Sequence, residues 1–568
     1  MGTQGRELRR HFLREYLESD LVAPGVDQHA GAAIVLGALL TPGILLPLLL
    51  SFKYGVPWWS VIEREGASWE DKLLFILLAM IASGFVSLAA WDALQPARRD
   101  RLVLGPLPLR PGVIVRAQVA SLAVLVLAVN VASMGAGPVL FALVMVSGSS
   151  TATWTGVART MAGHAAACLM AGAWVFLCAV GTNAVLFNML GAASFRRAGS
   201  VLRVIGAAGL AGLFLSLPRM IGRVEGLVAA PPWWAEWAPP LWFLGVWEYV
   251  AGHGDAWWTR LAWRGAWSTS ALAVVALCGL ALGYARRLGG QTAVSQATAA
   301  GGQGIRRLLR SRVLSGSGVG TAGARACFAF SLQTLTRSAP HRLIVGAILG
   351  AGLACAALVL TQGARGATAS QGDDGPAVLA VQHILTLSIA VGIRIAAAFP
   401  AELPASWVFS FLSTGRVNEW ILGVKRAALW AGVLPVILLT WPLTAIRFGA
   451  AAATIHAIVG FVASACWIGV LFIGVTKAPF SSTLEAGRGG PKARWALYFV
   501  AFLSFIYVLV QVEAAAMGST SGRLALAAGS AVVYAAIRRL ERITGRTPRP
   551  PRFDDGDDWD FQSLDLSR

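Results

Sequence analysis

Apolar stretches long enough to cross a membrane, which takes about 20 residues in a helix, recur along this 568-residue chain. Hydrophobic residues make up 56% of the sequence and charged residues only 13%, against about a quarter in soluble domains. The predicted fold class is therefore all-α, a polytopic membrane protein with about 12 transmembrane helices in two six-helix halves. The predicted spans cover 30–51, 72–91, 113–134, 164–190, 202–217, 266–285, 342–361, 377–399, 425–441, 449–476, 494–514 and 519–537.

One further apolar segment, 138–147, is too short to span. We expect it to continue the preceding span or to re-enter after a break at Gly135–Pro138. Broken backbone is not tolerated against lipid, so the break should be buried in protein.

The net charge of +19 has a topological explanation. With the N-terminus inside, most Lys and Arg residues fall on cytoplasmic segments, as the positive-inside rule requires when both termini are cytoplasmic. We therefore expect membrane lipids and no nucleic acid as partners. The first apolar run follows an Arg-rich segment and should remain as an anchor. The abundance of Arg, Ala and Gly favours a bacterial plasma (inner) membrane.

Composition divides the chain into five segments. Residues 1–29 predict an amphipathic cytoplasmic helix and 30–285 a first six-span unit. A Gly-, Ser- and Arg-rich cytoplasmic linker with a second amphipathic helix occupies 286–341, and a second six-span unit occupies 342–537. Residues 538–568 change from basic to acidic, a pattern typical of a disordered cytoplasmic tail.

Acidic residues are missing from the middle of every predicted span. Glu513 and Asp92 lie closest to apolar runs, and both sit at the ends of those runs. Carriers driven by protons or sodium usually keep an ionisable group within the bilayer. The sequence therefore shows no internal energy source for transport.

Metal and disulfide chemistry are not expected. His164, His383 and His456 lie in or near spans, but neither His383 nor His456 has a second ligand three or four residues away on its own helix. Cys168, four residues after His164, is interpreted with the other cysteines as a small buried hydrophobe. The six cysteines show no C-x-x-C spacing and are interpreted as small buried hydrophobes. We predict no metal site and no catalytic residue.

The longest outward stretch, 218–265, is dense in tryptophan. Tryptophan favours the headgroup layer, so we expect short helices in the outer leaflet. The residues predicted to lie at this interface are Trp233, Trp234, Trp237, Trp242 and Trp247.

Two cytoplasmic segments, 92–116 and 399–426, carry large apolar side chains beside charged ones. Such side chains need a partner, the membrane or the protein's own bundle to cover them. The candidate docking residues are Arg98, Arg99, Asp100, Leu104, Leu107, Leu109, Glu402, Trp407, Phe409 and Arg416.

The string Pro96-Ala97-Arg98-Arg99-Asp100, followed by Leu107-Pro108-Leu109, resembles the cytoplasmic loop of ABC-2 type permeases, the membrane subunits of one class of ATP-binding-cassette exporters. The six-span unit, the amphipathic first helix and the small outer-leaflet helices are also similar. The resemblance implies that this loop docks on an ATPase. The second half looks like a divergent copy, with only a short outer connection at 515–518.

No nucleotide site is visible. A P-loop needs a lysine after a glycine, and none of Lys53, Lys72, Lys425, Lys477 and Lys492 follows one. We expect no cofactor in this chain, and ATP with Mg on a partner ATPase subunit. Homo-oligomerisation is left open. The chain is thus expected to be a permease and not an enzyme.

Two alternatives stay open. The first outward loop holds Glu63, Glu65, Glu70 and Asp71 near several tryptophans, and membrane glycosyltransferases that use a lipid-linked donor place acidic residues in such a loop. A simpler interpretation is that these four acids are exposed to water and have no catalytic role. A non-catalytic membrane scaffold is the other alternative.

Overall fold

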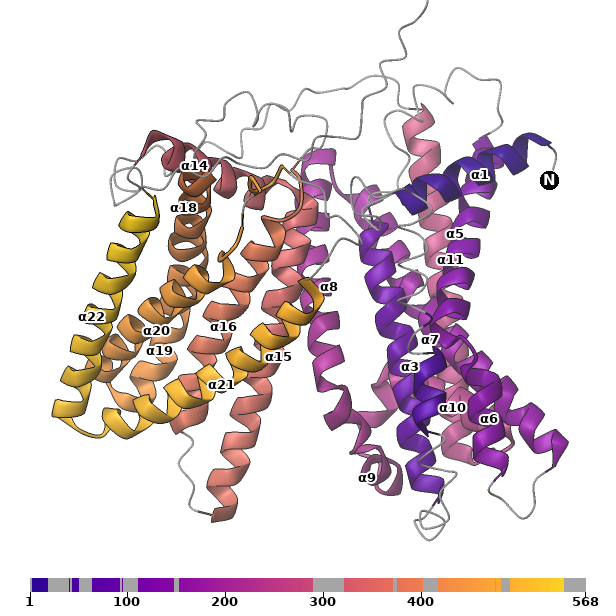
Figure 1. The fold of residues 1–568 in the computed structure, drawn as a ribbon. Helices are drawn as coiled ribbons and strands as arrows, with labels where there is room; N and C mark the ends of the chain where they lie inside the picture. Colours follow the sequence, from indigo (N-terminus) through magenta and orange to yellow (C-terminus); the bar gives the residue numbers. More distant parts are fainter. Residues whose placement is uncertain are drawn as a thin grey trace, which may run out of the picture. The chain divides into compact units, whose positions relative to one another are not determined.

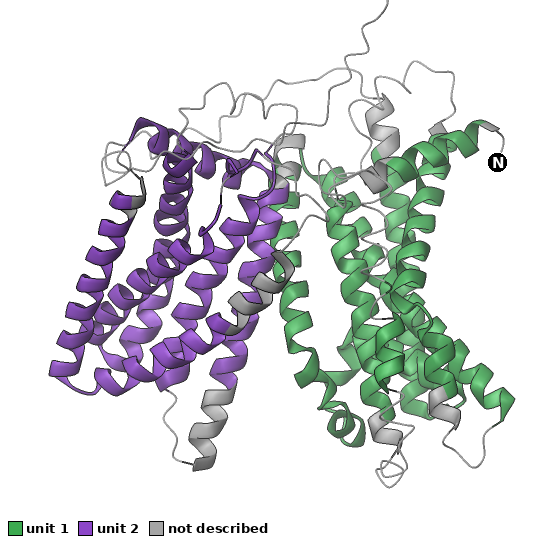
Figure 2. Cartoon of the chain, in the orientation of Figure 1, with its two compact units in different colours: residues 1–22, 27–298 green, residues 23–26, 299–568 purple. Residues whose placement is uncertain are grey.

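The computed structural model describes residues 3–18, 40, 43–50, 64–91, 94, 111–147, 153–289, 321–370, 375–401, 417–475, 477–481 and 491–545. These residues are almost wholly helical and contain no strand (Figure 1). The chain divides into two compact units, residues 1–22 with 27–298 and residues 23–26 with 299–568 (Figure 2). The division falls within the predicted linker.

Unit 1 comprises the helices α1 (Thr3–Glu18), α3 (Arg64–Ala89), α5 (Pro111–Met134), α6 (Gly137–Ser147), α7 (Trp154–Met189), α8 (Ala192–Ile221), α9 (Val224–Ala229), η2 (Ala235–Trp237), α10 (Pro239–Ala251) and α11 (Ala256–Gly289). Their ends follow local chemistry. Thr153 caps α7 by accepting a hydrogen bond from the Gly156 amide. α10 begins with prolines and ends at Gly252, whose φ of 100° needs a glycine.

Unit 2 comprises α14 (Ala322–Arg337), α15 (Ala339–Ser370), α16 (Gly375–Ala396), α18 (Val417–Ala427), the π-helix η5 (Ala428–Val433), α19 (Leu434–Phe448), α20 (Ala450–Leu471), α21 (Pro491–Met517) and α22 (Thr520–Gly545). The Thr321 side chain caps α14 by accepting from the Ala324 amide. Gly449, with a φ of 84°, separates α19 from α20.

In the described part of the chain, 10 helices are long and apolar enough to cross a membrane. They coincide with ten of the predicted spans. The predicted span 30–51 lies mostly outside the described residues, and 494–514 corresponds to the shorter apolar stretch Ala501–Met517. The prediction of an all-α, polytopic membrane protein is thereby confirmed.

Exposed apolar side chains support the same conclusion. On α22 the side chains of Leu524, Val532 and Leu540 are exposed. A helix in water would turn such residues towards a core. Contact with lipid hydrocarbon would keep these side chains out of water.

The two amphipathic helices pack on their own units. Leu8 and Phe12 of α1 are buried in one cluster with Ile114 and Ala117 of α5, and the Ser121 hydroxyl donates to the Arg9 carbonyl oxygen at 2.9 Å. In unit 2, Phe328 and Leu332 of α14 cluster with Ala427, at the end of α18. The apolar faces of the two predicted amphipathic helices therefore cover other helices of their own unit.

In each unit the long helix that receives the amphipathic helix is irregular. In unit 1 the helix breaks at Gly135, whose φ is 50°, and resumes as α6. A side chain at Gly135 would lie 3.1 Å from the backbone of Gly43, so the break packs against protein, with Gly135 partly buried and Gly137 buried. The predicted helical segment at 138–147 is present as α6. In unit 2 the corresponding helix contains the π-turn η5 between α18 and α19.

Candidate functional site

The predicted docking residues cannot be placed. Arg98, Arg99, Asp100, Leu104, Leu107, Leu109, Glu402, Trp407, Phe409 and Arg416 all lie outside the described residues, as does Asp92. Their docking role stays a prediction.

The residues at the start of each docking segment are held firmly in place. The Asn183 amide donates to the Trp91 carbonyl oxygen at 3.1 Å, and the Gln118 amide donates to that of Leu94 at 3.1 Å. In unit 2, the amides of Ala401 and Phe480 donate to the carbonyls of Phe480 and Ala397, each at 2.9 Å.

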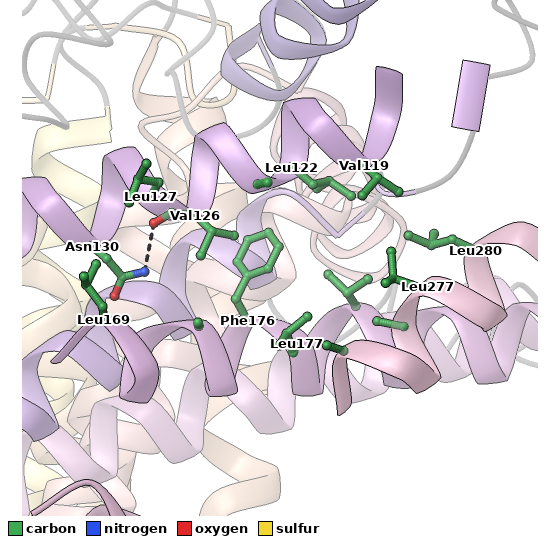
Figure 3. Close-up of a pocket in the computed structure, with 15 residues that line it drawn as sticks. Val119, Leu122, Val126, Leu127, Asn130, Leu169, Phe176, Leu177, Leu277 and Leu280 are labelled. Carbon is green, nitrogen blue, oxygen red and sulfur yellow. Dashed lines mark hydrogen bonds between the residues drawn. The ribbon is translucent and has the colours of Figure 1, made fainter. Parts of the chain in front are cut away.

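An apolar pocket of about 380 Å³ lies between α5, α7 and α11 (Figure 3). Its lining is aliphatic apart from Phe176 and Asn130. The Asn130 amide donates to the Val126 carbonyl oxygen at 2.8 Å, and its own oxygen accepts from the Ser83 hydroxyl at 3.3 Å. With its one polar group already bonded, the pocket suits an apolar ligand.

The predicted interface tryptophans divide into two groups. Trp233, Trp234 and Trp237 are exposed and keep their predicted role. Trp242 is partly buried and donates its indole N–H to the Glu236 carbonyl oxygen at 2.8 Å. Trp247 has no exposed surface, so its placement at the lipid interface is wrong. The periodicity of α10 turns Trp247 towards the core of unit 1, where it meets other aromatic rings.

A buried ion pair joins α3 to α10. The Lys72 ammonium lies 2.6 Å from one Glu248 carboxylate oxygen, and the His253 Nδ1 lies 2.8 Å from the other. Burial raises the pKa of Glu248, but the hydrogen bond from His253 and the charge of Lys72 outweigh burial and hold the pKa below its ordinary value. All three groups are partnered, so the cluster acts as a structural tie.

Three of the four acids of the glycosyltransferase alternative lie in a helix. Glu65, Glu70 and Asp71 belong to the first turns of α3, and Asp71 is buried; Glu63 lies outside the described residues. Asp71 is therefore not a solvated loop acid, because the helix begins before the predicted span and turns this residue inward.

His383 of α16, His456 of α20 and Glu513 of α21 meet inside unit 2. Their side chains are at most 3% exposed. Glu513 is thus not a group at the open end of an apolar run. Possible metal ligands on other helices do surround His383 and His456, which contradicts the reason given for expecting no metal site. That expectation considered ligands on the same helix, whereas these come from three helices.

His164 does not join this cluster. It is buried in unit 1, with ring centroids 4.8 Å from Phe75 and 4.6 Å from Trp247. Among the described residues, its ring lies against the aromatic rings of Phe75, Phe141 and Trp247.

Comparison of the chain with family models, with curated proteins and with solved structures finds no match in any of the three. The resemblance to ABC-2 type permeases therefore rests on the quoted residues, and the function must be argued from the architecture.

Proposed function

We propose that this chain is the permease of an ATP-binding-cassette exporter, which moves a hydrophobic or amphipathic substrate with energy from a separate ATPase subunit. The observation that carries the proposal is the repeated plan of the two units. Each has an amphipathic helix packed on a long helix that is irregular, α1 on α5 with its break at Gly135 and α14 on α18 with the adjoining π-helix. Internal repeats and discontinuous helices are common features of transporters.

The pocket between α5, α7 and α11 supports the proposed class of substrate. Its volume of about 380 Å³ lies within the range of small-molecule sites, about 300–1,000 Å³. A hydrocarbon portion would gain about 25 cal/mol for each Å² removed from water. A strongly charged substrate would find no counter-charge among the pocket's lining residues.

The proposed ATPase docks on the segments around Arg98–Leu109 and Glu402–Arg416, and ATP and Mg bind that partner. The proposed location is the bacterial plasma membrane with both termini in the cytoplasm. The amphipathic helices would then lie on the same side as the ATPase, next to the segments that receive its motion.

Efflux from whole cells tests the proposal. Cells that produce the chain with its ATPase should lose a preloaded lipophilic dye faster than cells without the chain, and ATP depletion should abolish the difference. Leu107→Asp should reduce the rate to background while the protein stays in the membrane, because a charge would disrupt an apolar docking face.

Leu564→Asp provides a matched control, since the same exchange in the tail should leave efflux unchanged. Efflux that persists after ATP depletion, or that is unaffected by Leu107→Asp, would contradict the proposal.

A further inference from the structure

We propose that His383, His456 and Glu513 bind one divalent transition-metal ion, with Zn²⁺ as the best-suited species. This inference does not depend on the proposed transport function, because it rests only on the interior of unit 2.

The three side chains converge on one point. The His383 Nε2 lies 3.1 Å and the His456 Nδ1 lies 2.8 Å from the same Glu513 oxygen, Oε2. One potential ligand atom from each residue can be chosen so that all lie within 4.8 Å of one another. Ligands on a tetrahedral zinc ion, at about 2.0–2.1 Å from the metal, lie about 3.4 Å apart, so small side-chain shifts would accommodate the ion.

Two buried polar atoms of the cluster have no hydrogen-bond partner among the described residues. They are the His456 Nε2 and the Glu513 Oε1. Leaving a buried acceptor unsatisfied costs about 1–3 kcal/mol, and more when the group is charged. Coordination of a cation by both carboxylate oxygens would remove that cost for the Glu513 Oε1, whereas the His456 Nε2 would carry the ring proton when Nδ1 is the ligand.

The donor set selects the class of ion. Imidazole nitrogen suits Zn²⁺, Cu²⁺, Fe²⁺ and Ni²⁺, whereas Mg²⁺ and Ca²⁺ prefer oxygen ligands. Two histidines and one carboxylate also form the ligand set of many open zinc sites, in which a further position remains for water or another ligand.

Neighbouring hydrogen bonds hold the histidine-bearing helices in register. Gln382, next to His383, donates to the His456 carbonyl oxygen at 3.0 Å and accepts from the Thr440 hydroxyl at 3.3 Å. α16, α19 and α20 are thereby fixed to one another around the cluster. These bonds fix the backbone that carries the two histidines.

The cluster lies towards one end of the helix bundle of unit 2. His383 is in the third turn of α16, His456 in the second turn of α20, and Glu513 near the end of α21. An ion could therefore reach it from that end without crossing the whole bundle.

Metal titration of the purified full-length chain in detergent tests the proposal. After chelation and dialysis, the wild type should take up one Zn²⁺ or Co²⁺ per chain, measured by elemental analysis, and Co²⁺ should give visible d–d absorption. H456Q and E513Q should each weaken binding by about tenfold or more. The control H341Q removes another buried histidine of unit 2, outside the cluster, and should bind as the wild type does.

H383C keeps the test decisive if the other variants fold poorly. A cysteine in place of a ligand histidine should add a sulfur-to-cobalt charge-transfer band that the wild type lacks. Absence of stoichiometric uptake by the wild type, or affinities of H456Q and E513Q equal to that of H341Q, would overturn the proposal. Absence of the new band in folded H383C would also overturn it.

Discussion

Lys72 and Glu248 are separated by 176 positions in the sequence and share a hydrogen-bonded ion pair with both side chains nearly inaccessible. Removing two charges from water costs free energy, and their mutual attraction offsets this cost only while both partners are present. The pair therefore fixes where α10 lies against α3 more than it adds net stability. Replacing only one of the two residues should therefore destabilise the folded protein.

Lys72→Met should destabilise the protein by about 3–5 kcal/mol, because it leaves the Glu248 charge buried beside only His253. Thermal unfolding in detergent measures the loss. The double variant Lys72→Met/Glu248→Gln should recover much of it, since the orphaned charge is gone. Equal stabilities of wild type and Lys72→Met would show that the pair is not buried as described.

The shifted pKa of Glu248 should make the stability of the protein depend on pH. Its pKa in the folded protein lies below the ordinary value, so its contribution to stability is present above the pKa of the unfolded chain. That contribution is lost as the pH falls through the lower, folded pKa. The melting-temperature difference between wild type and Glu248→Gln should therefore shrink on acidification. A difference that grows on acidification would mean that the pKa is raised.

At the scale of elements, close helix packing depends on glycines at crossing points. A Cβ atom added at Gly423 of α18 would lie 2.6 Å from the Ala324 carbonyl oxygen and 2.8 Å from the Cys327 Cβ. This close approach allows α14 to lie against α18. At Gly469 of α20, in contrast, an added Cβ would meet nothing within 4 Å.

Gly423→Ala should destabilise unit 2 by about 1–3 kcal/mol, the usual cost of overpacking. Gly469→Ala, the matched control, should be neutral or stabilising by about 0.5–1 kcal/mol, since alanine favours the helix. Thermal unfolding of both variants in detergent measures the contrast. The same melting temperature for both would argue against tight packing of α14 on α18.

The helices could be predicted because a span is a local property. Runs such as 342–361 and 377–399 are predominantly apolar, and the structure places α15 and α16 there. The break after Gly135 was also visible, from glycine and proline at short spacing. Such signals involve neighbours in sequence.

The buried clusters could not be predicted because they join residues from distant helices. Nothing near His383 in the sequence indicates that Glu513, 130 positions away, will meet it. A search for ligands at helical spacing misses such sites. The signal that could have found them is the presence of rare ionisable residues close to apolar runs, whatever their spacing.

At the scale of the whole molecule, the two units repeat one plan with different interiors. Unit 1 holds the apolar pocket and the Lys72–Glu248 pair, whereas unit 2 holds the His383–His456–Glu513 cluster. The His383–His456–Glu513 cluster bears on the energy source for transport, because an ionisable group inside a helix bundle can bind a coupling proton. The decisive comparison is therefore between transport driven by an ATPase subunit and transport driven by a proton gradient.

The most direct test reconstitutes the purified chain alone in sealed vesicles and follows a lipophilic dye under an imposed proton gradient, without nucleotide. We predict that the dye only equilibrates across the membrane, and that uphill movement begins when the ATPase subunit and ATP are supplied. Uphill movement driven by the proton gradient alone would contradict the account.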